Sequence, residues 1–278
     1  MTDGSYFSPR AKHNYIFSMY PQHSLYNPSF LNKLKWTQWN FITNSPYTQS
    51  YVEKWTGKKS EVMYPYLDII PFEKVQSFKK DKIILTVGRF FRHLHAKRHD
   101  ILIKAFKQLQ QKNEAFKDFT LYLIGGLKEE DKDYLQELMT LVGDDPHIIF
   151  LPNASHETVL EHYKKALFYW HGTGYGVDER THPEAVEHLG MTPLEAMALG
   201  CIVFCHASGG PKEIIRNGQN GFLYNTIEEL VEQTLRIYKE HNKMESISRN
   251  AYEYIKEHFD YGVFKKKIVS HFRLTNYI

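Results

Sequence analysis

From residue 82 onward, short apolar runs rich in β-branched residues alternate with longer amphipathic runs, and this alternation constrains the fold more than any other feature. Apolar runs that end at Gly, Pro or His are typical of buried strands, and the runs between them have the helical period. A strict strand–helix order predicts βαβ units, a parallel sheet and helices on both faces. We therefore expect an α/β fold of Rossmann-like type. Its expected strands are 82–88, 119–126, 147–152, 166–172, 201–205 and 221–224.

The region before this alternation has a weaker pattern. A strand-like run at 40–45, a helix-like run and a second strand-like run at 60–65 are typical of the end of another α/β domain. Prolines and scattered charge then indicate a connection. We therefore predict a partial N-terminal α/β unit with its linker over 1–75, a Rossmann-like domain over 76–242, and C-terminal helices over 243–278 that pack back on the N-terminal part.

Charge and composition exclude several classes of protein. The 35 Lys and Arg residues against 32 Asp and Glu give a formal net charge of +3, which is too small to indicate a nucleic-acid binder. No apolar run approaches the roughly 18 residues that a membrane span needs, and the N-terminus has no apolar signal-peptide core. Cys201 and Cys205 lie in one strand-like run, about 13 Å apart, too far for a disulfide. We expect a cytoplasmic protein, at most peripheral to the inner face of a membrane.

The stretch EHLGMTPLEAMALG, residues 187–200, predicts a loop followed by a helix. Thr192, Pro193 and Glu195 fit the N-cap, the first helical position and the third position of a capping box. The same helix start, with its amides from Gly190 to Leu194 and its positive dipole end, is also suited to a phosphate. Glu195 can then accept hydrogen bonds from the two hydroxyls of a ribose. The spacing leaves both interpretations open.

Two cations follow the first strand of the alternating region. Arg89 comes directly after the run at 82–88, and Lys97 stands where the next helix is expected to begin. Ligands of parallel sheets bind at the carboxyl ends of the strands, and an Arg fork beside a Lys charge suits a diphosphate. The alternative interpretation of Arg89 is a solvated loop residue.

Taken together, these segments resemble the C-terminal donor domain of retaining group 1 glycosyltransferases of the GT-B fold, of the family 4 type. The resemblance covers about residues 82–240 and rests on an ordered set of motifs. They are GRF, KRHDILIKAF, LYLIGG, HIIFLP, the pair Glu187 and Glu195 followed by AMALG, then GGPKEII and NGQNGFLY.

The resemblance implies a site for a nucleoside-diphosphate sugar such as a UDP- or GDP-sugar, with an unknown acceptor and no metal or other cofactor. It implies catalytic roles for Arg89 and Lys97 on the diphosphate and for Glu187 on the transferred sugar. It gives Glu195 to the ribose. The loop of His188, Gly190, Met191 and Thr192 is expected to offer backbone amides to phosphate and sugar, and Pro152 and Asn153 are expected to border the base. Asp131 and Asp133 form a D-x-D, but their acidic surroundings indicate a solvated helix start.

The sequence departs from the family pattern in three places. Leu189 stands where the family commonly has an aromatic residue, and KRHD replaces a lysine–glycine pair, so Arg98 is expected to crowd or supplement the phosphate site. The approach to Glu187 is longer than usual and adds His171, Arg180 and His182, to which we assign no role.

Fewer than about 80 residues precede the donor domain, which is less than a whole domain. The resemblance therefore implies an incomplete acceptor domain, either because the chain is the C-terminal part of a longer protein or because the scaffold is reduced. Neither His13 nor His23 can be matched to the family's acceptor-side histidine. We expect a glycosyltransferase that moves a sugar to a glycan, lipid-linked or other acceptor with retention.

Two other functions stay open at this point. A non-catalytic nucleotide-sugar-binding module would use the same donor fold. A dinucleotide-dependent oxidoreductase would need G-x-G-x-x-G after its first strand, where GRFFRH has a single glycine.

Overall fold

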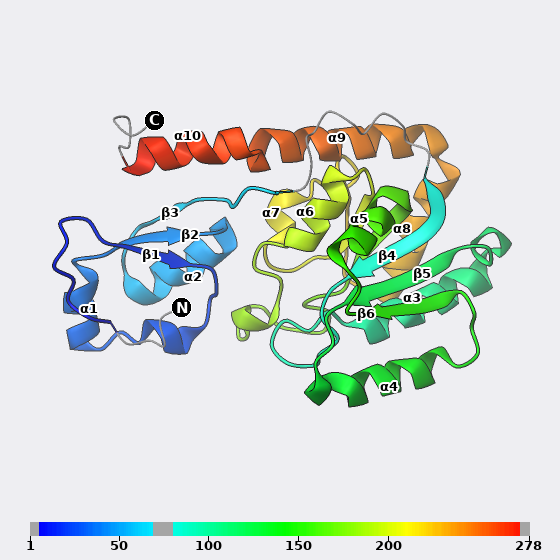
Figure 1. Cartoon of the computed structure of the whole chain (residues 1–278), viewed down its shortest axis with the longest axis horizontal. Helices are drawn as coiled ribbons and strands as arrows, with labels where there is room; N and C mark the ends of the chain where they lie inside the picture. The colour runs from blue at the N-terminus through cyan, green and yellow to red at the C-terminus, as the bar shows by residue number, and fades with distance from the viewer. Residues whose placement is uncertain (1–5, 69–79, 273–278) are drawn as a thin grey trace.

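The computed structural model describes residues 6–68 and 80–272, which form two parallel sheets (Figure 1). The larger sheet has the order β6-β5-β4-β7-β8-β9, and every pair in it is parallel. All six strands expected from the sequence are confirmed. Their bounds are β4 (Asp81–Val87), β5 (Thr120–Gly125), β6 (Ile148–Pro152), β7 (Ala166–His171), β8 (Ile202–His206) and β9 (Phe222–Tyr224).

The order of this sheet places its crevice. The chain moves outward from β4 to β6, then crosses back to place β7 on the other side of β4. This is the strand order of the Rossmann fold, in which a ligand crevice opens where the order reverses, outside the carboxyl ends of the two central strands. The ends of β4 and β7, at Val87 and His171, therefore mark the candidate site.

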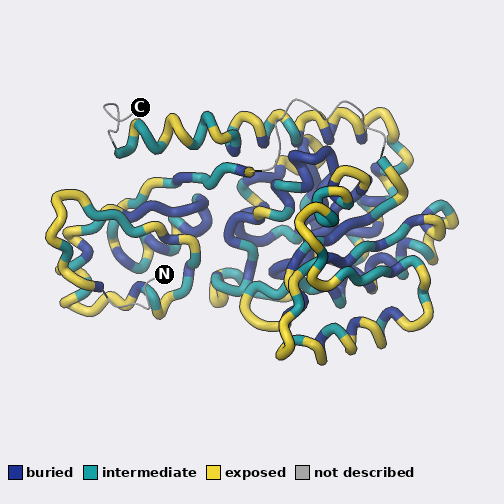
Figure 2. The backbone as a smooth tube through the Cα atoms, viewed as in Figure 1, coloured by how far each residue is buried: buried dark blue, intermediate teal, exposed yellow. Residues whose placement is uncertain are grey.

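Helices cover both faces of the larger sheet, as the sequence predicts. Neighbouring strand residues such as Ile84 and Leu85 are both fully buried but belong to opposite hydrophobic cores, which explains why the strands read as continuous apolar runs. Figure 2 shows this buried centre in dark blue. One core contains α3 (His99–Lys112), α4 (Lys132–Val142) and α8 (Ile227–Lys239). The other contains α5 (His156–Lys165), α6 (Met191–Ala198) and α9 (His241–Phe259).

The helix expected over PKEIIRN is shorter than predicted. It forms the single turn α7 (Pro211–Ile214), because Ile215 adopts an extended backbone and the Asn220 side chain bonds the Arg216 amide (2.7 Å) and the Ile214 carbonyl (3.1 Å). Three 3-10 turns complete the domain: η2 (Glu114–Phe116), η3 (Glu129–Asp131) and η4 (Pro183–Ala185).

Residues 6–68, the N-terminal unit, contain the smaller sheet. Its order is β1-β2-β3. The predicted strand, helix and strand are confirmed as β2 (Asn40–Thr43), α2 (Pro46–Thr56) and β3 (Ser60–Val62), whereas β1 (Tyr15–Ser18), η1 (His23–Tyr26) and α1 (Phe30–Trp36) were not predicted. The boundary that the sequence suggests near residues 70–80 falls almost wholly on 69–79, outside the described residues.

The C-terminal helices run along both sheets. Figure 1 shows α9 beside the larger sheet and α10 (Tyr261–Phe272) beside the N-terminal unit. The rings of Tyr15 and Phe272 lie 4.6 Å apart, and His271 Nδ1 is 2.5 Å from Glu61 Oε2. Within the part of the chain that the structure describes, no helix combines the length and apolar character needed to cross a bilayer.

Candidate functional site

Three side chains meet in the crevice between β4 and β7. Lys97 Nζ donates to Glu187 Oε2 at 2.7 Å, and His171 Nε2 is 3.0 Å from the same oxygen. Lys97 and Glu187 are 13% and 14% exposed, and His171 is buried at the end of β7. The structure thus brings together two residues predicted to be catalytic, Lys97 and Glu187, and one to which no role was assigned, His171.

Lys97 governs the charges in this cluster. Burial alone would raise the pKa of Glu187, but the charge of Lys97 and the hydrogen bond that it donates outweigh burial and lower the pKa to about 2. Burial, assisted by Lys97, lowers the pKa of His171 to about 3. Glu187 is therefore ionised and His171 neutral at pH 7. A neutral ring that donates from Nε2 has Nδ1 free to accept, and Thr173 Oγ1 lies 3.4 Å from that nitrogen.

Glycines allow the backbone to close around the cluster. A Cβ on Gly88 would lie 2.4 Å from Lys97 Cγ, and one on Gly209 would lie 2.0 Å from the Glu187 carbonyl oxygen. Gly210 donates its amide to that same carbonyl at 2.8 Å. The two glycines of the GGPKEII motif are therefore required by local packing, because they let the loop after β8 approach and support the Glu187 loop.

The helix that follows Glu187 begins differently from the sequence prediction. Its N-cap is Gly190, at φ 99°, and no side chain caps it, so the expected capping box of Thr192, Pro193 and Glu195 is wrong. Thr192 lies within the first turn, where its Oγ1 accepts from the Tyr169 hydroxyl at 2.8 Å. The Leu194 amide donates to the Gly190 carbonyl. Proline has no amide hydrogen, so the unbonded amides that we expected up to Leu194 are reduced to those at the very start of α6.

Glu195 is free of the capping role and faces α5 instead. Its Oε2 accepts from the Tyr163 hydroxyl at 3.0 Å. Burial raises the pKa of this carboxyl, and the bond from Tyr163 lowers it in part. Among the described residues no Lys, Arg or His side chain forms an ion pair with it. A half-buried carboxylate without a cation is suited to accept hydrogen bonds from neutral hydroxyl groups.

The remaining predicted residues lie along the carboxyl edge of the same sheet. Arg89 follows β4 and is exposed, with its guanidinium carbon 4.6 Å from the centre of the Phe91 ring. Pro152 ends β6, and Asn153 follows it at φ 55°. The Asn153 side chain bonds both the amide (2.9 Å) and the carbonyl (3.1 Å) of Leu127, so it joins the loops that follow β5 and β6.

Arg98 does not reach the phosphate side of the crevice as expected. Its guanidinium forms two bonds of 3.1 Å with the Asp100 carboxylate and another with the Tyr175 carbonyl. Arg180 and His182 are exposed and pair locally, with Asp178 and Glu184.

The N-terminal unit contacts the Glu187 loop directly, which the sequence did not reveal. Ser45 Oγ donates to the His188 carbonyl at 2.7 Å, and the Tyr47 ring stacks on the His188 ring at an interplanar angle of 7°. The Tyr51 hydroxyl donates to the Glu179 carbonyl at 2.7 Å. Ser45 is recognisable as a helix N-cap before Pro46, but nothing local signals a partner 143 residues away.

The acidic residues that could suggest a metal lie elsewhere. Asp131 and Asp133 stand at the start of α4. Across residues 6–68 and 80–272, no three His, Cys, Asp or Glu side chains are grouped so that they could hold a metal ion. Cys201 and Cys205 are buried and free.

Comparisons with known proteins agree with this geometry. The sequence profile described as "Glycosyl transferases group 1" matches residues 70–254. A mouse GDP-Man:Man(3)GlcNAc(2)-PP-Dol alpha-1,2-mannosyltransferase is 27% identical over 203 residues, covering 67% of this chain and 38% of the relative. A sucrose synthase from Melioribacter roseus is 34% identical over 94 residues, or 32% of this chain and 12% of the relative. The chain therefore spans well under half the length of these relatives.

Solved structures share the fold at lower identity. A glycosyltransferase from Rickettsia africae ESF-5 superposes with a TM-score of 0.71 at 17% identity, covering 94% of this chain and 71% of that one. Anabaena Alr3699/HepE, solved in complex with UDP and glucose, gives 0.70 at 19% identity and covers 92% and 71%.

Proposed function

Because the chain belongs to the group 1 glycosyl transferase family, we propose that its crevice binds a nucleoside-diphosphate sugar and transfers the sugar, with retention, to a glycan, lipid-linked or other acceptor. The observation that carries this proposal is the buried Lys97–Glu187 pair beside the start of α6, at the carboxyl ends of the central strands. The GDP-mannose named in the mouse relative and the UDP-sugar bound in the Anabaena structure make these the two donors to test.

The proposed division of labour follows from the chemistry of each group. As the bond to the anomeric carbon breaks, negative charge builds on the diphosphate oxygens. Arg89, Lys97 and the amides at the start of α6 stabilise that charge, and a preorganised donor of this kind contributes about 3 to 4 kcal/mol. Lys97 has three N–H donors, so it can bind a phosphate oxygen while it keeps its bond to Glu187.

The carboxylates of Glu187 and Glu195 bind hydroxyl groups of the donor. Glu187, ionised at its low pKa, accepts hydrogen bonds from the transferred sugar, and His171 holds it in place from the other side. Glu195, which lacks an ion-pair partner among the described residues, accepts from the ribose. In this proposal cationic side chains and a helix dipole stabilise the charge on the diphosphate, so no metal is required.

Thermal unfolding with GDP-mannose and with UDP-glucose tests donor binding. A ligand at 100 times its dissociation constant adds about 2.7 kcal/mol to stability. Arg89→Ala and Glu195→Ala should each abolish the shift, and Asp131→Ala, remote from the crevice, should leave it intact. A parent protein that shifts with no nucleotide sugar defeats the proposal.

Product analysis tests the chemistry. Retention predicts that the new glycosidic bond keeps the anomeric configuration of the donor, which NMR of the product reads directly, and turnover should persist in EDTA. An inverted product overturns the assignment of retention. Donor binding without transfer to any acceptor would instead support a nucleotide-sugar-binding module built on the same fold.

A further inference from the structure

A second cavity, of about 520 Å³, lies beside the candidate site and not within it. Its walls are the loop before α3, one side of α4, and the stretch between β7 and η4. Pockets of about 300 to 1,000 Å³ are the usual size for small organic ligands. Apart from Arg98, which was expected to crowd or supplement the phosphate site, none of the residues predicted to bind the donor lines this cavity.

The cavity and the crevice share a wall. Ala96 and Arg98 line the cavity, whereas Lys97 between them bonds Glu187 in the crevice. Ala185, on the opposite rim, precedes Glu187 by two residues, so their Cα atoms are at most about 7 Å apart. The cavity therefore lies next to the loop that carries Glu187, where the transferred sugar is proposed to bind.

This wall is fixed in place, so the cavity is preformed. Leu94 and Arg98 both adopt left-handed backbone conformations, at φ 53° and 52°, which non-glycine residues keep only when their surroundings hold them. Arg98 is held by its fork on Asp100 and its bond to the Tyr175 carbonyl. Beneath it, a Cβ on Gly172 would lie 3.1 Å from the Lys97 carbonyl oxygen.

The lining charges cancel. Arg98 pairs with Asp100, and Arg92 pairs with Glu137 while its guanidinium lies 5.1 Å from the Tyr134 ring centre. A diphosphate or another polyanion favours an excess of cations, which this cavity lacks. Its charged rim is equally unsuited to an acyl chain, because a chain would separate these groups from water without offering hydrogen bonds in return.

A neutral saccharide matches the lining. Sugar hydroxyls both donate and accept, and the cavity offers guanidinium N–H donors together with carboxylate acceptors. Leu138, Leu141 and Val177 add apolar surface for the C–H groups of a pyranose ring. We propose that this cavity binds neutral sugar units of the acceptor glycan, next to the unit that receives the transferred sugar. This inference rests on the proposed function and names its acceptor class.

Saturation-transfer NMR on the full chain, with maltotriose and mannotriose as neutral probes and a sulfated disaccharide as an anionic one, tests the assignment. At least one neutral probe should bind saturably, and the anionic probe should not compete. Val177→Trp, which fills the cavity, should weaken binding at least tenfold. Met139→Trp is the matched control, because Met139 is an exposed residue of α4 that does not line the cavity. It should leave binding unchanged.

The donor-induced thermal shift is measured on the same variants and separates the two proposals. It should be the same in Val177→Trp as in the parent. A missing shift in the parent counts against the proposed function, whereas saccharide binding that is absent, prefers the anionic probe or survives Val177→Trp overturns the cavity assignment. If Val177→Trp does not fold, Glu137→Gln gives the same readout, because Glu137 is 56% exposed and its loss removes an acceptor without a change of shape.

Discussion

The two sheets of this chain differ in how far the apolar side chains around them are buried. The six-stranded sheet is covered on both faces, and its strands β7, β8 and β9 are buried along most of their length. The N-terminal unit instead exposes Phe7, Phe17, Met19, Phe30, Leu31 and Leu34, most of the large apolar side chains that are exposed among the described residues. The helices of the six-stranded domain cover its apolar side chains, whereas the N-terminal unit leaves several large apolar side chains exposed.

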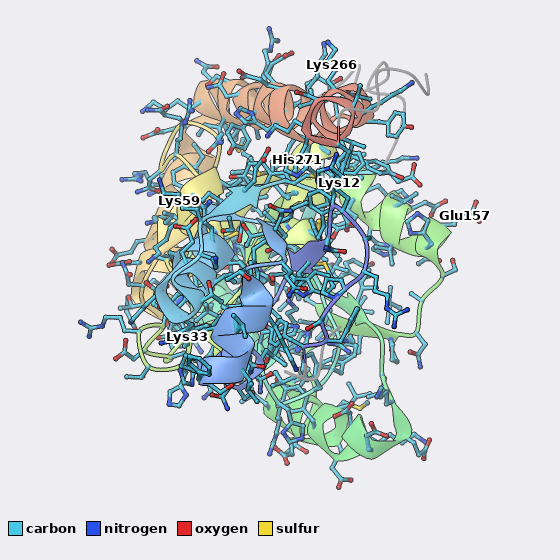
Figure 3. The ribbon with its side chains drawn as sticks, turned by 90° about the vertical axis from the view of Figure 1, so that its left-hand side faces the viewer. Lys12, Lys33, Lys59, Glu157, Lys266 and His271 are labelled. Carbon is cyan, nitrogen blue, oxygen red and sulfur yellow. The ribbon has the colours of Figure 1, made fainter. Side chains whose placement is uncertain are left out.

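Charge differs between the two regions as well. No acidic residue occurs from Gly4 to Val52, although that stretch contains Arg10, Lys12, Lys33 and Lys35. Lys12 and Lys33 both lie on the N-terminal unit, which faces the viewer in Figure 3. In the six-stranded domain, by contrast, Lys97 is buried against the carboxylate of Glu187. The comparison suggests that the larger domain is stable by itself and that the N-terminal unit depends on it.

The largest expected effect comes from a core substitution in the six-stranded domain. Phe168 on β7 is fully buried between Phe119 and Phe204. Phe168→Ala should cost about 3 to 5 kcal/mol, a large part of the total stability of a domain. Because the stability of the N-terminal unit is inferred to depend on this domain, amide hydrogen exchange should accelerate in both regions. Leu34→Ala, at an exposed position, is the control. Persistent protection of β1 to β3 in Phe168→Ala would mean that the smaller unit is independent.

A core substitution in the N-terminal unit should have a local effect. Trp36 is fully buried in the small core of the N-terminal unit, against Tyr6 and Phe41. Trp36→Ala should remove about 3 to 5 kcal/mol from that core. Amides of β1 to β3 should then exchange rapidly, while β4 to β9 keep their protection. If protection is lost across both sheets, the two regions unfold as one unit and the comparison is broken.

The sequence predicts the six-stranded domain well because each of its strands carries the signal by itself. A run such as CIVFC is buried on both faces, so every residue in it is apolar. In contrast, β1 has the partly buried pattern of YIFS, and α1 buries Trp36 but exposes Phe30, Leu31 and Leu34, so neither shows a helix or strand period. Those elements form through contacts with distant residues, which a single sequence does not display.

The candidate site likewise contains some residues that the local sequence predicts and others that it does not. Arg89 follows a strand and Glu187 lies in a motif, and both positions could be read from local pattern. His171 could have been found from topology, since it ends the strand beside β4. The capping box failed because the left-handed Gly190 starts the helix before Thr192. The bond from Ser45 to His188 joins two domains and leaves no trace in spacing.

Acid should destabilise the six-stranded domain specifically. Burial, assisted by the nearby charge of Lys97, lowers the pKa of His99 to about 4. The unfolded chain binds a proton near pH 6.5 and the folded one does not, so stability falls as pH drops from 6.5 towards 4. His99→Phe should remove this term and gain about 2 kcal/mol at pH 5 relative to pH 8. Equal differences at both pH values, measured by urea unfolding, would contradict it.

Glu213 gives a slope of opposite sign. Burial raises its pKa to about 7, so the stability it contributes as a neutral acid is present at low pH and lost as pH rises through 7. Glu213→Gln should therefore flatten the curve of stability against pH between about 4.5 and 7. Urea unfolding of this variant beside His99→Phe separates the two contributions.

The smallest effect on stability tests the bond that couples the two regions. Ser45 caps α2, accepting from the Thr48 amide at 3.1 Å, and also donates to the His188 carbonyl. Ser29 caps α1 in the same way, accepting from the Asn32 amide at 3.2 Å, and is exposed. Each Ser→Ala should cost about 1 kcal/mol, the usual value for a lost N-cap.

Only Ser45→Ala should also weaken donor binding, because the loop that carries Glu187 and Gly190 loses its anchor on the N-terminal unit. We expect a severalfold increase in the dissociation constant of the nucleotide sugar, measured by calorimetry, and none in Ser29→Ala. An unchanged donor affinity in Ser45→Ala would mean that the remaining contacts, among them the Tyr47 ring on His188 and the amide of Gly210, position the loop without the Ser45 bond.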